Sequence, residues 1–118
     1  MITDPALAGA DAMVTSEVLA KVINEGAYDF VISGVESTDA RMSVVPAMIS
    51  ARLGDAQLTF ANKVEVDVAS KKISINRVTD SGEVEMEANF PAVLSVVEKI
   101  NEPRYPSFKG IMAAKKKE

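Results

Sequence analysis

The spacing of apolar residues changes once along the 118-residue chain, near Leu58-Thr59-Phe60. Before this point, apolar side chains recur every three or four residues, as on helices with one apolar face, and short continuous apolar runs separate these stretches. After it, apolar and charged residues alternate, which is typical of half-exposed antiparallel strands. Together the two patterns predict an α/β fold in which a parallel sheet is extended by an antiparallel β-meander. The length suits one domain, 1–118.

The first half of the chain reads as helix, strand, loop, helix. A helix is expected over Ala8–Asn24, with Gly26 as its C-terminal stop. The apolar run Tyr28–Gly34 predicts a buried strand between helices. After a polar loop, 35–43, apolar residues return at helical spacing until Gly54, where a second helix is expected to end.

The second half predicts a meander followed by a core strand. Its alternating stretches are joined by turn residues at 69–71 and 80–82. Strand alternation explains the spacing of the glutamates, which we interpret as a solvent face and not as paired catalytic carboxylates. The apolar run Ala92–Val97 predicts a strand that returns to the core, and a short helix is expected over Ser107–Ala114.

Composition narrows the function. The chain has neither cysteine nor histidine, which excludes thiol catalysis, disulfides, His-based triads and His-ligated zinc within it. This favours a binding protein over an enzyme, and no metal site is expected. The net charge is −4, with a basic end on an acidic body, which argues against general nucleic-acid binding. No apolar run is long enough to span a membrane, and the N-terminus does not resemble a secretory signal.

The loop after Gly34 is a candidate phosphate site. It leaves the C-terminal end of a strand and enters a helix N-terminus, where open α/β sheets bind ligands and where free N–H groups favour phosphate. Ser37, Thr38 and Ser43 supply hydroxyls, and Asp39 can accept from a ribose hydroxyl. The stretch lacks a glycine-rich fingerprint, so an ordinary capped connection explains it equally well.

The segment Asn101–Lys117 reads N-E-P-R-Y-P-S-F-K-G-I-M-A-A-K-K-K. Two prolines exclude a helix or strand interior between them. Tyr105 and Phe108 beside positive charge make a plausible docking surface. The alternative is a connector whose rings fold back onto the core, and the residues alone leave the two readings even.

At this segment the chain resembles the β subunit of electron transfer flavoproteins, especially actinobacterial versions. V-I-S-G-V-E-S-T-D at Val31–Asp39, V-V-P-A-M-I-S-A-R-L-G at Val44–Gly54 and the stretch Arg77–Ser95 agree in order and spacing. Family β subunits are about twice as long, so the chain resembles an internal fragment, and exposed sheet edges that allow self-association are expected.

The resemblance implies a Rossmann-like, adenine-nucleotide-binding sheet in a heterodimer with the electron transfer flavoprotein α subunit. That heterodimer is a bacterial cytoplasmic electron carrier with no chemistry in its β subunit. Its FAD is held mainly by the α subunit, and the β subunit usually binds AMP, or in some relatives a second flavin. The partners are flavin-dependent dehydrogenases such as acyl-CoA dehydrogenase. The alternative is a stand-alone adenine-nucleotide-binding module.

The resemblance assigns roles to two sets of residues, an AMP-binding loop and a dehydrogenase-docking segment. Within them, Ala40 and Ser43 stand where relatives often have glycine, and Phe108 stands where relatives often have a leucine-like anchor. The AMP-binding loop, called loop 34–45 below, comprises Gly34, Val35, Glu36, Ser37, Thr38, Asp39, Ala40, Arg41, Met42, Ser43, Val44 and Val45. The stretch 101–118 is expected to form a partner-recognition loop and a basic tail. Its dehydrogenase-docking residues, called the recognition segment below, are Asn101, Glu102, Pro103, Arg104, Tyr105, Pro106, Ser107, Phe108, Lys109, Gly110, Ile111 and Met112.

Overall fold

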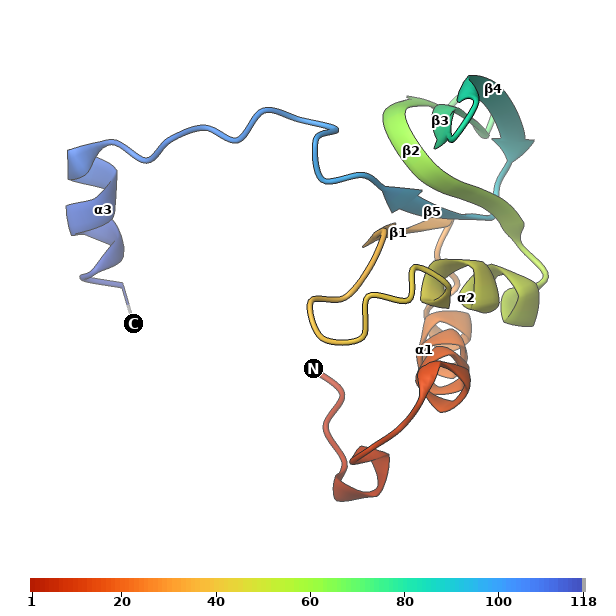
Figure 1. The fold of residues 1–118 in the computed structure, drawn as a ribbon, viewed down its shortest axis with the longest axis horizontal. Coiled ribbons are helices and arrows are strands. Elements are labelled where there is room, and N and C mark those ends of the chain that lie inside the picture. Colours follow the sequence, from red (N-terminus) through yellow and green to blue (C-terminus); the bar gives the residue numbers. More distant parts are fainter. Residues whose placement is uncertain (118) are drawn as a thin grey trace.

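A computed structural model describes residues 1–117 (Figure 1). Helices and strands alternate in its first part, and a run of strands follows. In chain order the elements are a 3-10 turn at Pro5–Leu7, α1 at Ala12–Gly26, β1 at Phe30–Gly34, α2 at Val45–Leu53, β2 at Ala56–Asp67, β3 at Lys72–Thr79, β4 at Gly82–Asn89, β5 at Ala92–Val96 and α3 at Phe108–Ala114.

The five strands form one mixed sheet in the order β1-β5-β2-β3-β4. β5 lies between β1 and β2 and is parallel to both, whereas β3 is antiparallel to β2 and to β4. The expected combination of a parallel part with an antiparallel meander is therefore confirmed. The last core strand in the sequence is the central strand of the parallel part, which is why its run Ala92–Ser95 is fully buried.

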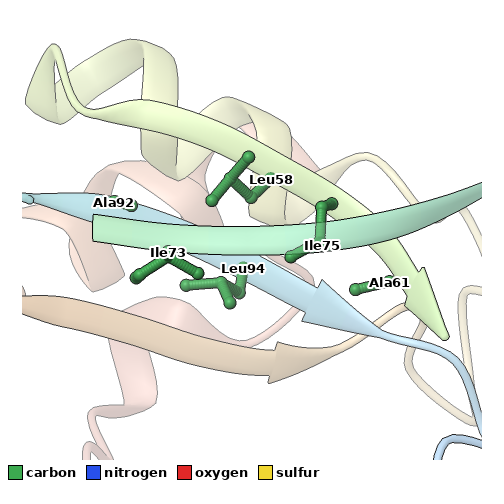
Figure 2. Packing of buried hydrophobic residues seen from close by; sticks show 6 residues of the cluster. All are labelled: Leu58, Ala61, Ile73, Ile75, Ala92 and Leu94. Carbon is green, nitrogen blue, oxygen red and sulfur yellow. The ribbon is translucent and has the colours of Figure 1, made fainter. Parts of the chain in front are cut away.

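Different structures cover the two faces of β5. α2 packs against β5 and β2, and α1 packs against α2, on the side where Val93 lies. On the other side β3 and β4 turn back over the parallel strands (Figure 1). There Ile73 of β3 lies beside Leu94 of β5, and Leu58 of β2 belongs to the same buried cluster (Figure 2). The meander is thus one wall of the main core.

A sharp bend in β2 makes this arrangement possible. Phe60 adopts a left-handed backbone conformation with φ of 63°, and the register with β5 shifts between Leu58 and Ala61. Bulges of this kind bend a strand and increase its twist. The buried hydroxyl of Ser95 accepts a hydrogen bond from the Phe60 N–H at 3.0 Å, so the amide that leaves the sheet ladder keeps a partner.

The helices match their expected positions to different degrees. α2 begins one residue before Pro46 and ends at Gly54, whose φ is 76°, as the sequence predicts. α1 begins at Ala12 and not at Ala8, because the side chain of Asp11 accepts from the N–H of Val14 and caps the helix there. The predicted stop at Gly26 is wrong by one residue, since Ala27 takes the left-handed conformation.

The prediction that Tyr28–Gly34 forms a buried strand is also wrong in part. β1 pairs only with β5 within residues 1–117, so it is an edge strand. Ile32 is 56% exposed because the meander covers β5 but does not reach this edge. The exposed edge agrees with the expectation from the resemblance.

The C-terminal part stands away from the sheet. After β5 the chain runs without regular structure to α3, whose N-cap is Ser107 (Figure 1). The expected helix over Ser107–Ala114 is confirmed. Within residues 1–117 no helix is both long enough and apolar enough to cross a bilayer.

The hydrogen bond at the bend gives the first prediction. Replacing Ser95 with Ala should lower the free energy of unfolding by about 1–3 kcal/mol, because the part-buried N–H of Phe60 loses the hydroxyl to which it donates. Urea unfolding followed by circular dichroism measures the change. Ser74→Ala is the control, because Ser74 on β3 makes no side-chain hydrogen bond within the described residues and should shift stability by less than about 0.5 kcal/mol. Equal losses for both variants would show that the Ser95 hydroxyl does not hold the bend.

Candidate functional site

A cavity of about 600 Å³ lies at the C-terminal end of β1. Its walls are the start of α1, the last residues of β1, most of loop 34–45 and the first turns of α2. This is the end of the parallel strands at which α/β sheets bind ligands, and the size is that of small-molecule sites. The structure thus adds a wall, α1, to the loop predicted from the sequence.

Hydrogen bonds join the two helices that form walls of the cavity. Arg52 of α2 donates to the hydroxyl of Ser16 at 3.0 Å and to the carbonyl of Met13 at 3.1 Å. Ser16 is completely buried, and its hydroxyl also donates to the Met13 carbonyl at 2.9 Å. Because these bonds involve the first turns of α1, they fix the distance between the α1 and α2 walls.

Loop 34–45 contains two residues in the left-handed region. Arg41 has φ of 47° and Ser43 has φ of 55°, a conformation that favours glycine. The Arg41 N–H donates to the Ser37 carbonyl at 3.2 Å, and the Ser43 hydroxyl donates to the Glu36 carboxylate at 3.1 Å. The loop therefore folds on itself, and its second bond brings a carboxylate close to the start of α2.

Asp39 is the carboxylate with the clearest electrostatic environment in the loop. Its pKa is lowered from the ordinary value, mainly by the Ser37 hydroxyl and then by the backbone N–H of Ala40, which donates at 2.7 Å. The side chain is therefore ionised at neutral pH and acts only as a hydrogen-bond acceptor. A ligand hydroxyl suits this acceptor, whereas a ligand anion does not.

Loop 34–45 does not contribute evenly to the cavity. Thr38, Arg41 and Val44 do not line it; of these, Arg41 Nε donates back to the Thr38 carbonyl at 3.5 Å. The loop residues that line it are Gly34, Val35, Glu36, Ser37, Asp39, Ala40, Met42, Ser43 and Val45.

The sequence reasoning missed the residues that other elements contribute. These come from α1, from the end of β1 and from α2, and include Asp11, Met13, Thr15, Leu19, Ser33 and Met48. No local signal marks the α1 residues as a binding wall. In the sequence, Asp11 is accounted for by its role as a helix cap, and the apolar residues are accounted for by the apolar face of a helix.

The chemistry of the cavity is apolar with hydrogen-bonding groups at one side. α2 has no side-chain cap, and Pro46 has no N–H, so the N–H groups of Val45 and Ala47 are the free donors of its first turn. Among the described residues, no lysine or arginine lines the cavity, whereas Asp11, Glu36 and Asp39 do. An anion can therefore bind here only through neutral donors, which are backbone N–H groups and hydroxyls such as those of Ser37 and Ser43. No cluster of three candidate metal ligands occurs within residues 1–117.

The recognition segment is exposed throughout. Tyr105 is 94% exposed and Phe108 is 80% exposed, so neither ring folds back onto the core. Ser107 accepts from the N–H of Gly110 at 3.1 Å and fixes the start of α3, on which Phe108, Ile111 and Met112 are all exposed. The recognition segment and the cavity do not share residues, and they are separate candidate surfaces.

Comparison with known proteins shows the family to which this chain is similar. The Electron transfer flavoprotein domain matches residues 1–118. The chain is 50% identical over 119 residues to the Electron transfer flavoprotein subunit beta of Mycobacterium tuberculosis, and 50% identical over 119 residues to that of Mycobacterium leprae. The protein of the same name from Thermoanaerobacterium thermosaccharolyticum is 35% identical over 114 residues.

The matches cover nearly all of this chain but under half of each relative. They include 99% of the chain for both mycobacterial proteins and 97% for the Thermoanaerobacterium protein. The chain spans 44% of the length of the mycobacterial relatives and 43% of the other.

Proposed function

The chain belongs to the electron transfer flavoprotein family, and from this premise we propose that it acts as part of a β subunit. In this role it binds AMP as a structural nucleotide, pairs with an α subunit that holds most of the FAD, and docks flavin-dependent dehydrogenases. It carries out no bond chemistry of its own. The observation that carries the proposal is the 50% identity to β subunits over 99% of the chain.

The cavity supports AMP binding by its chemistry. Apolar side chains such as Leu19, Met42 and Met48 suit the flat adenine ring, and the ionised Asp39 suits a ribose hydroxyl. The free N–H groups at the start of α2 would hold the phosphate. With AMP bound in this way, the parallel part of the sheet would serve as a Rossmann-like nucleotide-binding sheet.

One carboxylate opposes this assignment and should limit affinity. Glu36 is held by Ser43, two residues before α2 begins, so its negative charge lies near the proposed phosphate position. Among the described residues, no lysine or arginine lines the cavity to offset that charge. We therefore expect weak AMP binding by this chain alone.

The recognition segment supports docking by its exposure. A partner surface gains most from large apolar side chains, and Phe108 presents an exposed ring at the start of α3, where the Ser107 cap fixes the backbone. The nearby positive charges of Lys109 and the lysine run favour an acidic partner surface.

Coexpression tests the proposal as a whole. The polypeptide that contains this chain, produced together with the α subunit of the same organism, should purify as a yellow complex with flavin absorbance. A stand-alone nucleotide-binding module, the alternative, would purify without the α subunit but with AMP bound. A polypeptide that retains neither the α subunit nor a nucleotide contradicts both proposals.

AMP titration tests the role of Glu36. Changing Glu36 to Gln should tighten AMP binding by about 3- to 10-fold, because it removes a negative charge near the phosphate. Isothermal calorimetry at low salt measures the dissociation constant. Glu98→Gln removes the same charge from an exposed position outside the cavity and should leave the constant unchanged. If E36Q binds AMP no better than E98Q does, the phosphate does not lie at the start of α2.

Removing the aromatic anchor tests dehydrogenase docking. Phe108→Ala in the α–β complex should lower the rate of electron transfer from an acyl-CoA dehydrogenase at subsaturating concentration by about tenfold or more, as for an interface anchor. Flavin content and melting temperature should stay as in the wild type. Val68→Ala, which shortens another exposed apolar side chain just after β2, is the control and should have no effect. An unchanged rate for F108A would remove the docking role from this segment.

A further inference from the structure

The Arg52 side chain lies between α1 and α2 and is mostly buried, with 29% of its surface exposed. Its Nε donates to the Ser16 hydroxyl at 3.0 Å, its Nη2 donates to the Met13 carbonyl at 3.1 Å, and its Nη1 lies 3.9 Å from the Glu17 carboxylate. Residues 13, 16 and 17 are neighbours on α1 at spacings of three and four. One planar guanidinium therefore contacts a full turn of α1.

The rest of the joint between the two helices buries little apolar surface of α1. The fully buried residues of α1 are Ser16 and Ala20, and both side chains are small. Small side chains let two helices approach closely, but they remove little apolar area from water. Because α1 packs chiefly against α2, its orientation depends strongly on the polar contacts of Arg52.

The face of α1 beside this joint is the cavity wall. Ala12, Thr15 and Leu19 line the cavity, and their spacings of three and four residues place them on one face of the helix. Thr15 and Leu19 each come directly before a buried residue of the joint, Ser16 or Ala20. A rotation of α1 about its own axis would therefore carry the side chains of Thr15 and Leu19 out of the cavity.

We propose that Arg52 is a positioning residue of the cavity, whose guanidinium fixes the rotation of α1 so that Leu19 meets the base of the bound nucleotide. Arg52 does not line the cavity, so it acts through α1 and not by contact with the ligand. The inference rests on the proposed function, which supplies an adenine nucleotide as the ligand. Because Leu19 suits the flat ring and not the phosphate, Arg52 should affect a nucleotide and its nucleoside equally.

Paired titrations with AMP and adenosine test this role in the polypeptide that contains this chain, freed of bound nucleotide. Arg52→Met keeps the apolar stem but removes the donors. It should raise both dissociation constants by the same factor of about tenfold, as when one leucine contact is partly lost. Arg52→Lys keeps the charge without the planar fork and should fall between R52M and the wild type. The matched control, Lys21→Met, removes the same charge from an exposed position of α1 outside the cavity and should leave both constants unchanged.

Two further variants separate positioning from a general loss of stability. Ser16→Ala removes the acceptor of Arg52 Nε and should also weaken both ligands. The double variant R52M/S16A should bind no more weakly than R52M, because both changes break the same interaction. Ile75→Val removes a buried methylene from the meander side of the core, and it should lower the melting temperature without changing either constant.

The outcomes distinguish this inference from the proposed function. If the wild type binds neither AMP nor adenosine, the proposed AMP site and the role of Arg52 both fail. If the wild type binds AMP but R52M binds both ligands as K21M does, only the positioning role is overturned. It is overturned as well if R52M weakens AMP alone or the wild type binds AMP but not adenosine, since the apolar wall would then carry no binding. An equal weakening by I75V at an equal fall in melting temperature overturns it too.

Discussion

Phe60 donates its backbone N–H to the buried hydroxyl of Ser95, and this bond joins the bend of β2 to the central strand β5. Because of the bend, β2 pairs in parallel with β5 through its first half and antiparallel with β3 through its second half. The meander then folds over β5 and brings Ile73 against Leu94. Without the bend, the apolar face of the meander would extend past the sheet into water, and the main core would lack one wall.

The same bend places the cavity and the meander on opposite faces of β5. The helices occupy one face of β5 and form the cavity at the end of β1, whereas the meander occupies the other face and covers the main core. The recognition segment lies apart from both on an extended connection (Figure 1).

Much of the fold follows from local patterns. The alternation in β3 and β4, the limits of α2 at Pro46 and Gly54, and the start of α3 at Ser107 each depend on residues within a few positions of one another. The position of a strand in the sheet does not depend on such local residues. Nothing in the run Phe30–Gly34 shows that it lies at an edge, because burial of a strand depends on what packs beside it. The N-cap at Asp11 outweighed the apolar spacing that suggested an earlier start of α1.

The sequence by itself determined the class of fold, the loop after Gly34 and the lack of a helix or strand between the two prolines of the recognition segment, since periodicity, turn residues and proline act over short distances. Only the tertiary structure decided that α1 forms a wall of the cavity, that its lining within residues 1–117 holds three carboxylates and no basic residue, and that the Arg77 guanidinium lies over the Phe60 ring. Each of these depends on residues far apart in the chain. Their meeting is set by the bend of β2 and the tie between Arg52 and Ser16, which no local pattern encodes.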